Sequence, residues 1–176
     1  VGLHVDIVQA ILQHHPEACT CRDEKIGATA LHIAMEQQKE TTTAATAPIQ
    51  AHQEQPSSVT LQMVDLFLQT DPNVVHVTRR DNGSTALHVA CWHGNKTALI
   101  QKLLEAGSNI HACRFDGATP LWLASCHGHW RTVQILLEYA AALEATTASR
   151  FHRANFQGKT PLYVAVAHTT RDHQTT

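Results

Sequence analysis

The sequence lacks a large excess of positive or negative charge, and it has no long apolar run. Thirteen lysines and arginines are set against fifteen aspartates and glutamates, which gives a net charge of −2 with histidine neutral. This balance leaves no basic field that could hold nucleic acid or an acidic membrane surface. No apolar stretch approaches the ~18–20 residues that span a bilayer. We therefore expect neither nucleic-acid binding nor insertion into a membrane.

Cysteine is also scarce, because the chain of 176 residues has only five and no C-x-x-C pair. A secreted disulfide scaffold has a denser and even set. The sequence therefore favours a reducing compartment, the cytosol or the nucleus. The chain opens on VGLHVDIVQ, which has neither an initiator Met nor the basic-then-apolar pattern of a signal peptide. We expect the natural protein to continue past at least one end.

Signatures of catalysis are missing as well. The sequence has no G-x-G-x-x-G, no P-loop, no H-E-x-x-H and no G-x-S-x-G. Single Asp, His and Ser residues occur, but nothing arranges them as a triad. We expect this chain to have no enzymatic activity and to need no cofactor.

One phrase, in contrast, occurs four times. It reads GATALHIA at 27–34, GSTALHVACWHGN at 83–95, GATPLWLASCHGH at 117–129 and GKTPLYVA at 158–165. The glycine suits a tight turn with positive φ, and the threonine two residues later can cap a helix. The aliphatic residues and alanine that follow give that helix a narrow apolar side. The phrase thus predicts four turns, each followed by a short helix.

A second helix is predicted after most of these first helices. The aliphatic residues recur at helical spacing over 5–13, 58–69, 97–107 and 131–140. Pro120 and Pro161 fall at the first position of the predicted first helices, where the missing N–H costs nothing. Gly94 and Gly128 lie eleven residues after their phrase glycines and are predicted to end the first helices.

The phrase resembles the T-P-L-H-x-A signature of ankyrin repeats, whose period is near 33 residues. The phrase glycines of this chain are 56, 34 and 41 residues apart. The resemblance implies an all-α fold, a solenoid of stacked helix-turn-helix units with β-turn fingers, over a single domain at 1–176. We expect partial repeats at 1–22 and 155–176 and complete repeats at 23–79, 80–113 and 114–154. The excess residues are placed in a flexible insertion at 39–58 and in an elongated finger at 142–157.

In proteins of this kind, the histidine of the phrase joins neighbouring repeats through backbone hydrogen bonds. The resemblance therefore gives His32 and His88 a structural role. Trp122 and Tyr163 take the same place in the later copies. This replacement argues against the bond there and suggests stacking or a local surface feature.

The resemblance also implies a protein partner, bound on the concave face that the finger tips and the exposed side of the first helices form. The tips are taken as Glu24, Lys25, Ile26, Ala28, Arg80, Asp81, Asn82, Ser84, Arg114, Phe115, Asp116, Ala118, Asn155, Phe156, Gln157 and Lys159. The helix positions are taken as Trp92, His93, Cys126 and His127, with Glu36, Gln37 and His168 at similar places.

From this set we select ten residues as the candidate binding site: Arg80, Asn82, Trp92, His93, Arg114, Phe115, Asp116, Cys126, His127 and Phe156. Aromatic residues and arginine are the types that most often anchor interfaces. The alternative is that the aromatic residues only pack on neighbouring fingers. Trp130 begins a second helix and is expected to pack on the outer layer.

Two other functions stay open at this point. Cys91, His93, Cys126 and His127 occupy similar places in consecutive repeats and are the ligand types that zinc favours. Against zinc, helices separated by ~8–10 Å do not bring equivalent residues into one ligand shell, and Cys91 fits a small core position. The array could also target or regulate an enzyme elsewhere in a longer chain. As an isolated unit we expect a monomer.

Overall fold

The computed structural model describes residues 3–36, 58–94, 97–143 and 153–171. These residues form α-helices and two short 3-10 helices, and no strand occurs among them. The α-helices are α1 (Leu3–His14), α2 (Ala30–Glu36), α3 (Ser58–Thr70), α4 (Ala86–His93), α5 (Thr97–Glu105), α6 (Pro120–Cys126), α7 (Trp130–Leu143) and α8 (Pro161–Arg171). The 3-10 helices are Pro16–Cys19 and Pro72–His76.

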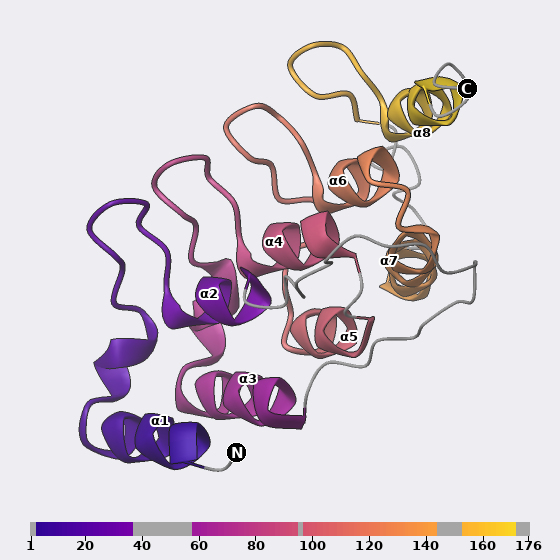
Figure 1. Ribbon diagram of the computed structural model, residues 1–176. Helices are drawn as coiled ribbons and strands as arrows, with labels where there is room; N and C mark the ends of the chain where they lie inside the picture. Colours follow the sequence, from indigo (N-terminus) through magenta and orange to yellow (C-terminus); the bar gives the residue numbers. More distant parts are fainter. Residues whose placement is uncertain (1–2, 37–57, 95–96, 144–152, 172–176) are drawn as a thin grey trace, which may run out of the picture.

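The helices stack in two layers, with a row of hairpin-like fingers projecting from one of them (Figure 1). Helices α2, α4, α6 and α8 make the inner layer from which the fingers rise, and each contacts the next. Helices α1, α3, α5 and α7 make the outer layer. The predicted all-α solenoid is confirmed, whereas the exact repeat boundaries stay a prediction. None of the described helices is both long and apolar enough to cross a membrane.

The repeated phrase forms the local structure that its residues predict. Helix α4 begins after Thr85, whose side chain and the His88 side chain form a reciprocal capping box. Helix α6 begins at Pro120, after Thr119 accepts a hydrogen bond from the Trp122 backbone. Gly94 ends α4 with φ of +71°, in the left-handed region that glycine adopts without strain.

The core lies between the two layers. Leu87, Ala90 and Cys91 of α4 are fully buried, which confirms Cys91 as a core residue. Leu103 of α5 is buried on the facing side. Trp130, in contrast, is 64% exposed at the start of α7, so the expectation that it packs on the outer layer was wrong. The guanidinium carbon Cζ of Arg131 lies 5.2 Å from the centroid of the Trp130 ring, so this ring makes a contact at the surface.

Two expected segments fall largely outside the described residues. Of the insertion predicted at 39–58, only Ser58 is described, and it begins α3. Of the finger predicted at 142–157, the first two residues belong to α7 instead, because that helix continues to Leu143. Its described part starts again at residue 153.

Both ring nitrogens of His32 make hydrogen bonds, and the bond of Nε2 joins two successive repeats. The Thr29 backbone N–H donates to Nδ1 at 3.2 Å, and Nε2 lies 3.0 Å from the carbonyl oxygen of Ser84. Because a backbone N–H can only donate, Nδ1 accepts, and the ring proton on Nε2 is donated to Ser84. The predicted structural role of His32 is confirmed. Burial lowers the pKa of this imidazole, which favours its neutral form.

The same contact continues unevenly along the stack. His88 bonds to Thr85 as His32 does to Thr29, but its Nε2 faces the backbone of Ala118 without a hydrogen bond of ordinary geometry. Trp122 instead donates its indole N–H to the carbonyl oxygen of Lys159 at 2.9 Å. The expectation that Trp122 does not make the bond was wrong, since an indole N–H is as able a donor as an imidazole N–H.

Candidate partner-binding surface

The fingers are joined edge to edge by a backbone hydrogen bond that recurs between each pair of neighbours. The backbone N–H groups of Arg80, Phe115 and Phe156 each donate, at 3.0 Å, to a carbonyl of the preceding finger. The acceptors are Ile26, Asn82 and Asp116, each directly before a phrase glycine. These bonds make Arg80, Phe115 and Phe156 structural equivalents, although the sequence alignment pairs Arg80 with Arg114.

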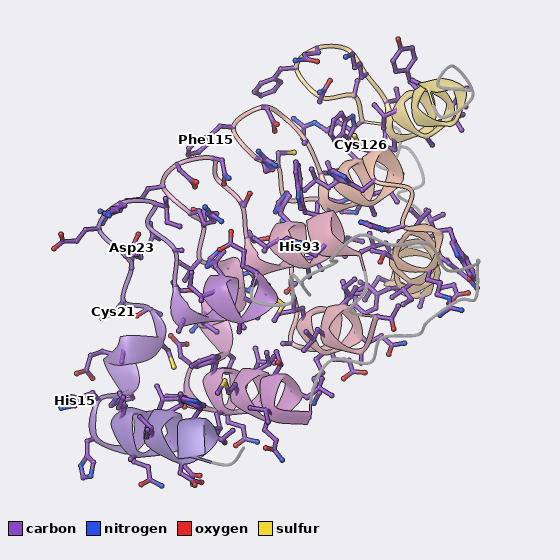
Figure 2. All side chains as sticks on the ribbon, in the orientation of Figure 1. His15, Cys21, Asp23, His93, Phe115 and Cys126 are labelled. Atoms are coloured by element: carbon purple, nitrogen blue, oxygen red, sulfur yellow. The ribbon has the colours of Figure 1, made fainter. Side chains whose placement is uncertain are left out.

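Each of these three side chains also lies over the phrase glycine of the preceding finger. A Cβ on Gly83 would stand 2.7 Å from the Phe115 ring, and one on Gly117 would stand 2.8 Å from the Phe156 ring. The phenyl rings therefore have a structural contact with the neighbouring finger. The rest of each ring faces outward, because Phe115 is 64% and Phe156 74% exposed. Figure 2 shows Phe115 at the outer end of its finger.

Several expected tip residues are buried, not available at the surface. Ala28, Ser84 and Ala118 follow their phrase glycines directly, and each is at most 3% exposed. Asn155 is also buried, because its side chain accepts backbone N–H groups of its own finger. For these four positions the predicted contact with a partner was wrong. For Ala28, Ser84 and Ala118 the physical reason is that the residue after the glycine turns back into the stack to start the helix.

On the inner helices, Trp92 is the most prominent predicted residue. It is 45% exposed at the end of α4, and its ring centroid lies 4.2 Å from that of His127, which is also exposed. His129 lies 3.0 Å from the Trp92 carbonyl oxygen through Nε2. His93 and Cys126 are half-buried nearby, and Figure 2 places them on α4 and α6. Gln37 lies outside the described residues, and of His168 only the backbone is described.

A pocket of about 640 Å³ opens where the second and third fingers meet the inner helices. Its walls come from α2, α4 and both fingers. The lining residues are Ile33, Glu36, Arg79, Asn82, Ser84, His88, Val89, Trp92, His93 and Arg114. Four of the ten predicted site residues line it, namely Asn82, Trp92, His93 and Arg114. Arg80, Phe115, Asp116, Cys126, His127 and Phe156 do not.

Arg79 lines the pocket, although the sequence analysis did not predict it as a site residue. The second finger is one residue longer than the third, so Arg79, not Arg80, takes the place of Arg114. The hydrogen bonds show this register: the Arg79 N–H donates to Ser84, and the Arg114 N–H donates to Ala118. The sequence did contain a sign of this register, because two adjacent arginines precede Asp81 and either could match Arg114. Alignment on the glycine alone selects Arg80, since it cannot detect an extra residue in the finger.

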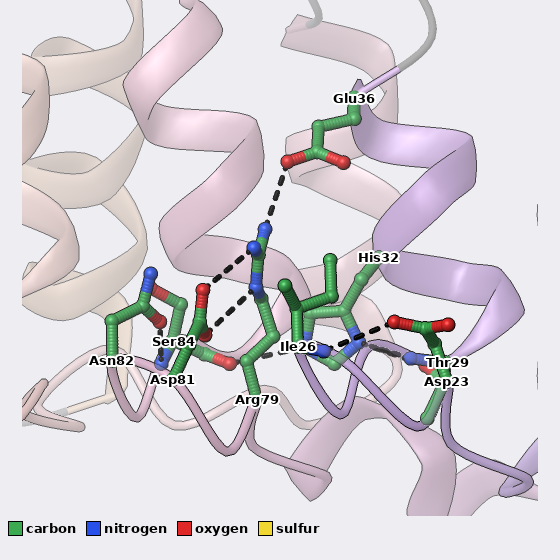
Figure 3. Close-up of polar contacts among 9 residues, drawn as sticks. All are labelled: Asp23, Ile26, Thr29, His32, Glu36, Arg79, Asp81, Asn82 and Ser84. Atoms are coloured by element: carbon green, nitrogen blue, oxygen red, sulfur yellow. Dashed lines mark hydrogen bonds and ion pairs between the residues drawn. The ribbon is translucent and has the colours of Figure 1, made fainter.

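The Arg79 guanidinium is held by two carboxylates (Figure 3). Nη1 donates to Glu36 Oε1 at 2.8 Å, and Nη2 and Nε donate to the two oxygens of Asp81 at 2.8 and 3.2 Å. Burial alone lowers the pKa of Arg79, but these hydrogen bonds outweigh it and raise the pKa above its ordinary value. Arg79 thus closes one wall of the pocket as a fully paired cation.

The four residues of the zinc hypothesis do not form a metal site. Cys91 is fully buried in the core, and burial raises the pKa of its thiol, which opposes the thiolate that zinc needs. Burial also raises the pKa of the Cys126 thiol. Within the part of the chain that the structure describes, no three His, Cys, Asp or Glu side chains gather in a way that could hold a metal ion. The zinc hypothesis therefore has no geometric support.

Comparison with known proteins agrees with this architecture. The family model described as ankyrin repeats (3 copies) matches residues 95–175. Human Ankyrin repeat and SOCS box protein 3 is 40% identical over 70 residues, which cover 38% of this chain and 13% of that protein. Human BCL-6 corepressor-like protein 1 is 41% identical over 66 residues, 37% of this chain and 4% of that protein. Probable E3 ubiquitin-protein ligase XBOS32 of Oryza sativa subsp. japonica is 29% identical over 86 residues, 49% of this chain and 17% of that protein.

This chain therefore matches the ankyrin-repeat family over residues 95–175. It spans between 4% and 17% of the length of these three relatives. Ankyrin repeats generally mediate protein–protein interaction, and ankyrin-repeat domains are typically interaction modules without enzymatic activity.

Proposed function

We propose that this chain is a non-enzymatic scaffold that binds a protein partner through its concave face and finger tips. The observation that carries the proposal is the row of exposed side chains Arg80, Phe115 and Phe156 on adjacent fingers, beside the pocket that Trp92 and Arg114 line. Of the ten predicted residues, Asn82, His93, Asp116, Cys126 and His127 complete this surface.

The row is more than scattered surface hydrophobicity. Single exposed apolar residues are normal on a soluble protein and need no explanation. Here one hydrogen-bond pattern repeats from finger to finger and presents a large side chain at the same position each time. An ordered row of aromatic and arginine side chains has the composition of an interface anchor. A partner that covers it removes Phe115 and Phe156 from water without rearranging the fingers.

The test is to capture partners from an extract of the cells that express the gene. The double variant W92A/F115A is compared with W130A/L137A, which removes side chains of matched exposure (64% and 44%) from α7 in the outer layer. We expect one set of captured proteins to be lost with W92A/F115A and kept with W130A/L137A. Circular dichroism shows that both variants are folded. Equal retention by both variants would contradict binding at the concave face.

We further propose a reducing compartment, the cytosol or the nucleus, for this chain. The support is the odd number of cysteines and the absence of a disulfide among all five, each of which lies in the described residues. Microscopy of the tagged full-length protein tests the compartment, and a signal confined to the secretory pathway would contradict it.

A second candidate function, as a targeting or regulatory array, is favoured because this chain covers only 4% to 17% of the length of the matched relatives. In a longer natural protein the same surface would bring a partner to another domain, as a targeting or regulatory array. One of the matched relatives has a name that describes a ubiquitin ligase. The test is to sequence the full-length transcript. An open reading frame that encodes only these 176 residues would contradict this role.

A further inference from the structure

Arg79 and Arg114 occupy the same place in consecutive fingers, but they are paired very differently. Arg79 has two carboxylates at hydrogen-bond distance, one from Asp81 in its own finger and one from Glu36 on the preceding inner helix. Among the described residues, Arg114 has one ion pair, with Asp116 of its own finger. The two groups are 3.7 Å apart, from Nε to Oδ1, which is beyond hydrogen-bond distance.

The difference lies at one position of the inner helix. Glu36 and Trp92 each stand nine residues after their phrase glycine, so they are equivalent in α2 and α4. Where Arg79 reaches back to the Glu36 carboxylate, Arg114 reaches back to the Trp92 ring, with Cζ 5.9 Å from its centroid. Arg79 and Glu36 thus form an ion pair between two repeats. In the next repeat, Arg114 is the equivalent arginine, but Trp92 stands where the carboxylate would be.

We propose that the pocket between Arg114 and Trp92 accepts an aspartate or glutamate side chain of the protein partner. This inference rests on the proposed function and names the chemistry that the site recognises. The partner's carboxylate takes the place at Arg114 that Glu36 takes at Arg79, and its methylene groups lie against the Trp92 ring.

The surroundings of Arg114 suit this ligand. The Arg114 side chain is only 18% exposed, so an ion pair formed there is partly shielded from water and stronger than one on the open surface. Asp116 is also engaged elsewhere, because its Oδ1 accepts the Ala118 backbone N–H at 3.0 Å. The apolar side chains of Ile33 and Val89 line the same pocket and can contact the aliphatic part of the ligand.

The charge of the site favours a carboxylate over a doubly charged group. The pocket walls carry Arg79 and Arg114 against Glu36, and Asp81 already neutralises one edge of Arg79. Asp116 adds a further negative charge beside Arg114. These two arginines and three carboxylates sum to one net negative charge, so a phosphate with nearly two charges is repelled more strongly than a carboxylate with one. The geometry therefore points to Asp or Glu, not to a phosphorylated residue.

The probe for this inference is a displayed library of random peptides selected on the intact 176-residue chain. We expect the selected peptides that W92A/F115A fails to bind to share an Asp or Glu at one position. Replacing that residue with Asn or Gln weakens binding to the wild-type chain by roughly 10- to 100-fold, the range for hydrogen bonds to a charged group.

Three variants assign this difference to Arg114. In R114Q the acidic peptide and its amide version bind about equally, because the cation is gone. W92E lowers the affinity for both peptides, because the Trp92 ring is lost, and also removes the difference between them, because Glu at position 92 pairs with Arg114 as Glu36 pairs with Arg79. R131Q removes an arginine on α7, in the outer layer and outside the pocket, and leaves the difference unchanged.

The outcomes separate this inference from the proposed function. Peptides that need Trp92 and Phe115 but show no acidic preference overturn the carboxylate inference and leave the scaffold intact, as does a preference that survives R114Q. A stronger preference for phosphoserine than for Glu also overturns it. If no selected peptide depends on Trp92 and Phe115, both the inference and the proposed function are wrong.

Discussion

The indole Nε1 of Trp122 donates a hydrogen bond to the carbonyl oxygen of Lys159, 2.9 Å away in the next repeat. His32 makes the same contact with Ser84 at 3.0 Å. Both acceptors directly follow a phrase glycine. The link between repeats therefore depends on an N–H donor of the right reach, and two chemically different side chains provide it.

Trp122→Phe removes this donor and keeps an aromatic ring in place. We expect the free energy of unfolding to fall by roughly 0.5–1.5 kcal/mol, the net value of one hydrogen bond. Urea unfolding followed by circular dichroism measures it. The matched control is Trp130→Phe, which changes an exposed ring and is expected to stay within about 0.5 kcal/mol of the wild type. Equal losses in the two variants would show that the Trp122 bond is not stabilising.

Gly117→Ala is expected to destabilise the stack far more than Gly158→Ala. Both glycines have positive φ, +79° and +75°, so alanine is strained at either position by roughly 1–2 kcal/mol. A Cβ on Gly117 also stands 2.9 Å from the backbone nitrogen of Phe156 and 2.8 Å from its ring, whereas Gly158 has open space.

The clash adds a further cost of about 1–3 kcal/mol at Gly117, because the neighbouring backbone cannot move without breaking the finger contact. Thermal and urea unfolding of the two variants, side by side, measure the difference. If both substitutions cost the same, the fingers are not packed as closely as their hydrogen bonds indicate.

The stability of the fold is expected to fall as the pH drops below about 6.5. Burial lowers the pKa of His88 to about 4 in the folded state, with the Ala118 backbone partly opposing this effect. The unfolded chain has the ordinary value near 6.5 and therefore binds more protons between these two pH values. The contribution of His88 to stability is complete above about pH 6.5 and is lost progressively towards about pH 4.

Urea unfolding at about pH 7.5 and about pH 5 measures this loss, and His88 accounts for roughly 2 kcal/mol of it. In H88Q the side chain does not titrate, so the loss should be smaller by that amount. H15Q replaces an exposed histidine and should keep the wild-type dependence. The same pH dependence in H88Q as in the wild type would contradict a neutral buried imidazole.

The sequence predicted most of the fold because the repeated phrase encodes local structure. Threonine at the cap, proline at the first helical position and glycine at Gly94 each act within one turn of chain, so their roles can be predicted without tertiary context. The buried Cys91 follows from its place in the helix for the same reason.

The candidate surface was predicted less completely, because it depends on contacts between repeats. Alignment on the glycines placed Arg80 opposite Arg114, whereas one extra residue in the second finger brings Arg79 there. Ser84 and Ala118 were expected at the tips, but the chain has already turned inward at these residues. The pairing of Arg79 with Glu36 joins residues 43 apart, and no local pattern indicates it.

The most direct test of the proposed scaffold is site-specific photo-crosslinking in an extract of the cells that express the gene. A benzophenone amino acid replaces Phe115 on the third finger or Trp130 on α7, two residues with the same 64% exposure. We predict a discrete protein adduct from position 115 and none from position 130. Adducts of equal yield at both positions, or at 130 alone, would contradict partner binding on the concave face.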